Sequence, residues 1–177
     1  MRWKAACLLG LLFSLVHSFA QLPGAAQTKT WEQLTASGSE LHAKGQYAEA
    51  ESVFRRALEK AEESADPRRI ARSLNDLAVV LYMRGDLAHA DEMFRRAVAI
   101  WEALPEPANL AAGLRNLASL SSEEAQYDRA GQLGRRALEI QLQISGPEAP
   151  EVASILEMLG DVHFESSEQH SPEGSGG

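Results

Sequence analysis

The chain has 177 residues, with 17 lysines and arginines against 25 aspartates and glutamates, a formal net charge of −8, and 45% hydrophobic residues. This length allows one folded domain or one short repeat array, and the acidic balance argues against nucleic acid or an anionic membrane surface as the principal partner. The only cysteine, Cys7, excludes a disulfide framework within the chain.

The first twenty residues have the layout of a secretory signal peptide. A basic start at Met1–Lys4 precedes the apolar run Ala5–Val16, and Ser18 and Ala20 place small side chains around a cleavage site after Ala20. The apolar run is shorter than the ~20 residues of a membrane-spanning helix. We therefore expect residues 1–20 to be cleaved from an exported protein, periplasmic or secreted, that does not insert into the membrane afterwards. An uncleaved anchor is the alternative.

Three segments of the chain align at a spacing of forty residues. They are GQYAEAESVFRRALEKA from Gly45, GDLAHADEMFRRAVAIW from Gly85 and AQYDRAGQLGRRALEIQ from Ala125. An upstream element repeats with them, as LNDLA from Leu74, LRNLA from Leu114 and LEMLG from Leu156. Repetition at a period of this length indicates an array of stacked structural units.

Both repeated elements are predicted to be helices. Their apolar or small residues recur at spacings of three and four, and no stretch alternates as a strand would, so the protein should be all-α. Gly45 and Gly85 suit helix ends, and Pro67 and Pro107 suit helix starts. We expect helical hairpins at about 31–64, 67–104 and 107–145 and a capping helix at 151–165. Residues 21–29 should form a flexible linker, and residues 166–177 a disordered tail.

The pattern Gly-x-Tyr-x-x-Ala-x-x-x-Phe-x-x-Ala, from Gly45 to Ala57, resembles the tetratricopeptide repeat (TPR). The LNDLA and LRNLA motifs, the RRALEI run and the GPEAPEVA linker from Gly146 are similar to the kinesin-light-chain type of this repeat, which also occurs in many bacterial proteins. The resemblance spans roughly residues 31–165. It implies an α-solenoid, a right-handed superhelix of three hairpins plus a C-terminal capping helix. HEAT and armadillo repeats have a similar length of ~40–47 residues but lack the Ala-x-x-x-Phe-x-x-Ala signature.

Small and aromatic residues predict how the helices pack. Trp31 and Trp101 lie at helix ends and are expected to be packing residues. Close approach of the helix pairs is expected at the small residues Gly38, Ala78, Ala118 and Gly160 of the first helices and at Ala50, Ala90 and Ala130 of the second helices.

The third hairpin departs from the repeat at two positions. Ala125 replaces the turn glycine, and Gly134 stands where the other hairpins have Phe54 and Phe94. Loss of a core phenylalanine lowers the free energy of unfolding by about 3–5 kcal/mol when its space stays empty. We therefore expect either that Leu133 shifts into the space or that the third hairpin is the least stable.

The sequence carries no motif of a known catalytic or cofactor site. It lacks a phosphate-binding loop, a His-Glu-x-x-His zinc motif, a calcium loop and a Gly-x-Ser-x-Gly nucleophile elbow. The four histidines after the leader are too scattered for two of them to share adjacent helical turns, so we expect no metal site. They are His42, His89, His163 and His170. We predict that the protein is not an enzyme and needs no cofactor.

Each predicted second helix carries an arginine pair, 55–56, 95–96 and 135–136. These pairs could form a basic stripe for an acidic partner. Glutamates four residues away favour a self-neutralised surface instead, since such pairs stabilise a helix by a few tenths of a kcal/mol each. The expected pairs join Glu51 and Glu59 to Arg55, Glu92 to Arg96, and Arg135 to Glu139.

The resemblance implies that the first helix of each hairpin lines a concave groove for a peptide. The candidate binding residues projected in this way are Arg72, Asn75, Asp76, Val79, Tyr82, Arg115, Asn116 and Ser119, with Glu157, Met158 and Asp161 on the last helix. Asparagine amides can hold a peptide main chain, and two arginines favour a peptide with a carboxylate unless they pair with Asp76 and nearby glutamates. The family's clamp for a C-terminal carboxylate needs Lys and Asn where this chain has Thr35 and Ser39, so a chaperone-tail partner is not expected.

We therefore predict a protein-interaction module, a scaffold or adaptor that binds a peptide or partner protein in its groove. The alternative is a structural or self-assembling repeat protein without a groove ligand, and the oligomeric state stays open between the two. A catalytic or ligand-sensing role has no support in any motif.

Overall fold

The computed structural model describes residues 29–169, and this part of the chain is folded into seven helices without a strand. The expectations for residues 1–20, for residues 21–28 and for the end of the tail fall outside the described residues. The helices are α2 (Trp31–Ala43), α3 (Tyr47–Ser64), α4 (Pro67–Met83), α5 (Leu87–Glu102), α6 (Pro107–Glu123), α7 (Tyr127–Ser145) and α8 (Pro150–Gln169).

Local sequence signals start and end these helices. Thr30 caps α2 in a reciprocal arrangement with Gln33, and Asp66 caps α4 one residue before its proline. The turns between the two helices of a hairpin need a left-handed backbone, which Gly45 and Gly85 adopt with φ of 72° and 80°. Ala125 takes the same conformation with φ of 57°, at the steric cost that a side chain incurs there.

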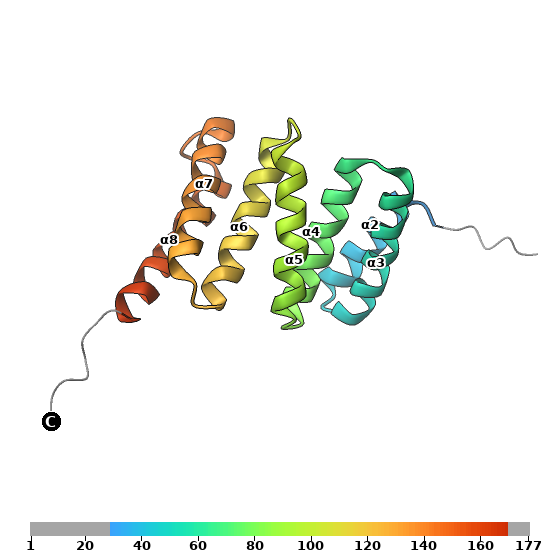
Figure 1. Cartoon of the computed structure of the whole chain (residues 1–177), viewed down its shortest axis with the longest axis horizontal. Helices are drawn as coiled ribbons and strands as arrows, with labels where there is room; N and C mark the ends of the chain where they lie inside the picture. Colours follow the sequence, from blue (N-terminus) through green and yellow to red (C-terminus); the bar gives the residue numbers. More distant parts are fainter. Residues whose placement is uncertain (1–28, 170–177) are drawn as a thin grey trace, which may run out of the picture.

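The helices stack in a row in chain order, from α2 and α3 at one end to α7 and α8 at the other (Figure 1). Each helix packs mainly on its neighbours in the sequence, as expected of a solenoid. The core consists mainly of alanine and leucine side chains, and the aromatic rings of Phe54 and Trp101 in it lie on glycines. A Cβ atom on Gly38 would lie 2.5 Å from the Phe54 ring, and one on Gly113 would lie 2.7 Å from Trp101. Gly38 is therefore tightly packed, but against the ring of Phe54 of its own hairpin and not, as we expected, against a second helix backbone.

Both predicted packing tryptophans contact neighbouring helices. Trp101 is 2% exposed and lies against Gly113 of the next hairpin. The indole N–H of Trp31 donates to the buried Ser73 hydroxyl at 2.8 Å, while the Arg69 guanidinium lies 5.2 Å from the centre of its ring. These two side chains therefore tie neighbouring hairpins together.

The space beside Gly134 is filled, although the sequence led us to expect a void or a shift of Leu133. A Cβ atom on Gly134 would lie 2.7 Å from Leu159 and 2.8 Å from Met158, both on α8. The following helix therefore inserts its own side chains where hairpins one and two use a phenylalanine. The missing phenylalanine therefore leaves no void beside Gly134.

The last helix differs from the prediction in length and in packing. It runs from Pro150 to Gln169 and so includes four residues that we expected in the tail. Gly160 was expected to allow close helix packing, yet a Cβ atom there would meet nothing within 4 Å. The reason is that no helix of the described residues follows α8 and covers this side.

Candidate functional site

A groove runs across the first helices of successive hairpins, between α4, α6 and α8. It encloses about 290 Å³. Its polar side chains come from α6 and α8, and its apolar side chains come mainly from α4. The lining residues are Val79, Tyr82, Met83, Phe94, Arg115, Asn116, Ser119, Ser154 and Met158.

Five of the eight predicted binding residues line this groove: Val79, Tyr82, Arg115, Asn116 and Ser119. The other three, Arg72, Asn75 and Asp76, lie on α4 outside it. Asn75 remains connected, because the Asn116 amide donates to the Asn75 side-chain oxygen at 3.1 Å. The structure therefore places the main predicted set on one continuous surface, with Arg72 and Asp76 at its edge.

The two predicted arginines have different surroundings. Arg72 lies 3.1 Å from the Asp76 carboxylate, which is the alternative we considered, in which the arginines pair with acidic residues of this chain. Arg115 donates to Ser154 at 3.3 Å and to Asn116 at 3.5 Å, and no carboxylate of residues 29–169 lies within 4.0 Å of its guanidinium. Arg115 is therefore the cation of the groove with capacity for an added anionic group.

Burial raises the pKa of Asp76 above its usual range, and the neighbouring Arg72 charge opposes that rise. The Asp76 side chain is only 15% exposed. The Arg72–Asp76 pair therefore offsets the cost of burying a carboxylate, and it withdraws Arg72 from ligand binding.

An acidic hollow of about 310 Å³ continues from the groove and shares Tyr82, Ser119, Ser154 and Met158 with it. Its carboxylates are Glu123, Glu157, Asp161 and Glu165. The Tyr82 hydroxyl donates to Glu123 at 3.2 Å, and burial together with this carboxylate raises the pKa of Tyr82. The site therefore has one cationic end and one anionic end.

Three lining residues were missing from the projected set. Phe94 had been assigned to the core, and it is indeed 2% exposed while still forming part of the groove wall. Met83 ends α4 and is 50% exposed. Ser154 was missed although the projection already included the last helix, because its hydroxyl carries no signal of its own.

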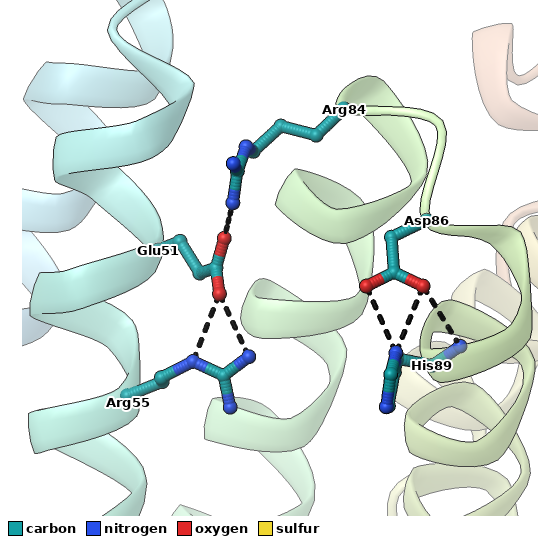
Figure 2. Close-up of polar contacts among 5 residues, drawn as sticks. All are labelled: Glu51, Arg55, Arg84, Asp86 and His89. Carbon is teal, nitrogen blue, oxygen red and sulfur yellow. Dashed lines mark hydrogen bonds and ion pairs between the residues drawn. The ribbon is translucent and has the colours of Figure 1, made fainter.

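The arginines of the second helices lie on a second surface, here called the outer face. The outer face consists of Glu51, Arg55, Arg84 and Asp91, together with the neighbouring arginines and carboxylates that form ion pairs with them. Glu51 binds Arg55 of its own helix at 2.7 Å and Arg84 of the next hairpin (Figure 2). Asp91, forty residues on, binds Arg95 at 2.7 Å and Arg129 of the following hairpin at 2.8 Å.

The predicted self-neutralisation of this face is confirmed for Glu51 and Arg55, whereas the other partners differ. Arg96 lies 3.7 Å from Glu62 of the preceding hairpin, not beside Glu92. The expected pairs of Glu59 with Arg55 and of Arg135 with Glu139 are not formed in the described part of the chain. The arginines reach between hairpins because a stacked neighbour offers a carboxylate at a distance that the long side chain can span.

Within residues 29–169, no cluster of three histidine, cysteine, aspartate or glutamate side chains is arranged to hold a metal ion. None of the helices over the same range combines the length and the apolar character of a membrane span.

Stacked helical hairpins with a shared groove define the described part as an α-solenoid repeat protein. The family model of the tetratricopeptide repeat matches residues 36–103, and the same pattern recurs forty residues later. Residues 36–103 therefore belong to the tetratricopeptide-repeat family. This repeat is in general a protein-interaction module without catalytic activity.

Solved structures with this fold include BtubC (BKLC) from P. vanneervenii, with a TM-score of 0.63 and 22% identity over 82% of this chain. The chain spans 65% of the length of that protein. The nearly identical TPR-like repeats of a Podosopora anserina putative kinesin light chain give a TM-score of 0.63 at 18% identity, covering 91% of this chain and 78% of that one. A variant of those repeats with one residue substituted gives 0.64 at 17% identity, covering 92% of this chain and 77% of the variant.

These likenesses establish a fold like that of kinesin-light-chain-type repeats and carry no information about partners. A comparison with curated protein sequences finds no match.

Proposed function

We propose that this protein is an interaction module that holds an extended peptide in the groove between α4, α6 and α8. The observation that carries the proposal is the position of Arg115. It lines the groove beside the Asn116 amide and has no carboxylate partner among the described residues. A guanidinium in a partly enclosed site binds a carboxylate more strongly than one in open water.

The remaining lining residues refine the chemistry of the expected peptide. Val79, Met83 and Met158 offer apolar surface next to Arg115, and Met side chains adapt to different partners. The acidic hollow beyond them, with Glu157 and Asp161, suits a lysine or arginine. We therefore expect a peptide that carries an acidic residue, then an apolar residue, then a basic residue.

Selection from a displayed library of random peptides, followed by titration of a selected synthetic peptide, tests this proposal. Arg115→Ala and Asn116→Ala should each weaken binding by about 1 kcal/mol or more. Arg55→Ala on the outer face is the matched control and should leave the affinity unchanged. If only the Arg55 substitution weakened binding, the peptide would lie on the outer face and the groove proposal would be wrong.

We also propose that the protein acts outside the cytoplasm, because residues 1–20 have the layout of a signal peptide. N-terminal sequencing of the protein recovered from the exported fraction should begin at Gln21. Recovery of a membrane-bound form that retains Met1 would contradict cleavage and make the segment an anchor.

A further inference from the structure

The last helix presents an uncovered apolar face, formed by Leu156, Gly160 and Phe164. Leu156 is 52% exposed and Phe164 is 62% exposed, whereas the other side of α8, with Val152 and Ile155, is buried against the array. The three residues are spaced by four, so they form one stripe along the helix. Large apolar side chains exposed together in this way mark a surface for association.

The repeat shows what kind of element covers this face elsewhere in the molecule. The leucines that align with Leu156 are Leu34, Leu74 and Leu114, and they are 1%, 0% and 0% exposed. Leu74 and Leu114 lie in core clusters with Ala97 and Ala137, which belong to the second helices of their hairpins. In the first hairpin the ring of Phe54 fills the place next to Gly38. Gly160 occupies the same place in the pattern, and nothing lies within 4 Å of a Cβ atom there. α8 is therefore a first helix without its second helix in the described residues.

The charges beside the stripe indicate which helix fits. α8 carries five carboxylates, at Glu151, Glu157, Asp161, Glu165 and Glu168, and no lysine or arginine. Glu157 and Asp161 each precede a stripe residue by three positions, so they lie along the edge of the stripe. A second copy of the chain would bring two such acidic edges together, which like-charge repulsion disfavours.

We propose that the face of Leu156, Gly160 and Phe164 docks an amphipathic helix of another protein, which completes the fourth hairpin. The docked helix places an aromatic side chain over Gly160 and lysines or arginines beside Glu157 and Asp161. This surface does not include Arg115, but it shares Glu157 and Asp161 with the acidic hollow next to the groove, so a docked helix and the basic residue of a groove peptide would compete for these two carboxylates.

Synthetic helices derived from α5 provide the probe, since α5 is a second helix of this same array. The basic peptide comprises residues 87–102 with Asp91→Lys, Glu92→Lys and Glu102→Lys. The acidic peptide has Arg95→Glu and Arg96→Glu instead. Fluorescence anisotropy with the full chain should show the basic peptide binding at least tenfold more tightly than the acidic one. Phe94→Ala in the basic peptide should remove most of this binding.

Substitutions in the protein locate the binding face. Leu156→Asp should weaken binding of the basic peptide at least tenfold. Gly160→Leu should have the same effect, because the leucine would fill the place of the aromatic ring. Leu142→Asp is the matched control, because Leu142 is also an exposed leucine, at 39%, but lies on α7. Arg115→Ala should leave this binding unchanged, which separates the docking face from the groove.

Three outcomes would overturn the proposal. Equal affinity for the basic and acidic peptides would remove the charge argument. Absence of binding by the basic peptide to a chain with intact helical circular dichroism would remove the docking face itself. Sedimentation could also show a concentration-dependent dimer that is absent in Leu156→Asp. That result would show that a second copy covers the face.

Discussion

The junctions after hairpins one and two differ from the junction after hairpin three, although all three derive from the same forty-residue repeat. In the first two, a carboxylate near the start of the second helix, Glu51 or Asp91, joins an arginine of its own helix to one of the next hairpin. The third hairpin has Gly131 at that position. In this junction, α8 instead inserts Leu159 and Met158 against Gly134.

The difference shows that one backbone arrangement tolerates two kinds of contact between neighbouring hairpins. Ion pairs on an exposed surface contribute little and weaken with salt, whereas buried apolar contacts contribute several times more. The third junction therefore lacks the ion pairs of the outer face, and its inner apolar contact comes from α8 instead of from a phenylalanine of the second helix. The following substitutions test this comparison.

The largest effect is expected at the aromatic residue that the third hairpin lacks. Phe54→Ala should lower the free energy of unfolding by about 3–5 kcal/mol, because the ring is 3% exposed and fills the space beside Gly38. Urea unfolding of the purified variant measures this loss. A loss below about 1 kcal/mol would mean that the neighbouring helices collapse into the space.

Introducing the same ring into the third hairpin should also destabilise the protein. Gly134→Phe would collide with Leu159 and Met158, and overpacking of this kind costs about 1–3 kcal/mol. Gly160→Phe on α8 is the matched control and should be close to neutral, since the space beside Gly160 is open. A stabilising Gly134→Phe would show that α8 is readily displaced.

A smaller change is expected at the turn of the third hairpin. Ala125→Gly should stabilise the protein by about 1 kcal/mol, because a side chain at φ of 57° is strained. Gly85→Ala, at φ of 80°, should destabilise it by a similar amount. Hydrogen exchange should be faster over residues 125–144 than over 45–64 and 85–104 in the unchanged chain, and Ala125→Gly should reduce the difference. Equal protection from exchange in all three segments would contradict the prediction that the third hairpin is the least stable.

Loss of the ion pairs of one carboxylate on the outer face should lower the stability still less. Glu51→Gln should lower the free energy of unfolding by about 0.2–1 kcal/mol at low salt, because both arginine partners, Arg55 and Arg84, are about half exposed. Thermal unfolding at low and high salt should show the difference between variant and unchanged chain shrinking as salt rises. A difference that grew with salt would mean that Glu51 acts by packing and not by charge.

The smallest effect is a pH dependence at Asp76. Burial raises the pKa of its carboxyl in the folded state, so the folded protein holds this proton more tightly than the unfolded chain does. Its contribution to stability should therefore fall as the pH rises from the ordinary value near 3.8 to the raised folded value, and stay level above it. Urea unfolding of the unchanged chain and of Asp76→Asn across pH 3–8 should show this trend as a difference between the two. A difference of the opposite slope would mean that Arg72 lowers the pKa of Asp76 more than burial raises it.

The helical repeat was predictable because forty-residue spacing, small residues and turn glycines are local features of the sequence. Arg115 and Asn116 could be assigned to the groove only through the resemblance to the repeat family, whose first helices line it. The ion pairs between neighbouring hairpins could not be predicted. The pairing of Arg129 with Asp91, for example, depends on how two hairpins stack. The same holds for Gly134, whose neighbours Met158 and Leu159 are more than twenty residues away in the sequence.

The hydrogen bond between Asn116 and Asn75 has a consequence for any peptide that enters the groove. The bond uses one of the two N–H groups of Asn116 and one lone pair of the Asn75 oxygen, so it orients both amides while each keeps a donor for a peptide main chain. Each contact with the peptide replaces a hydrogen bond to water, so it is worth only about 0.5–1.5 kcal/mol. Backbone recognition in this groove should therefore favour short contacts that form and break quickly, and long residence times would need the side-chain contacts at Arg115.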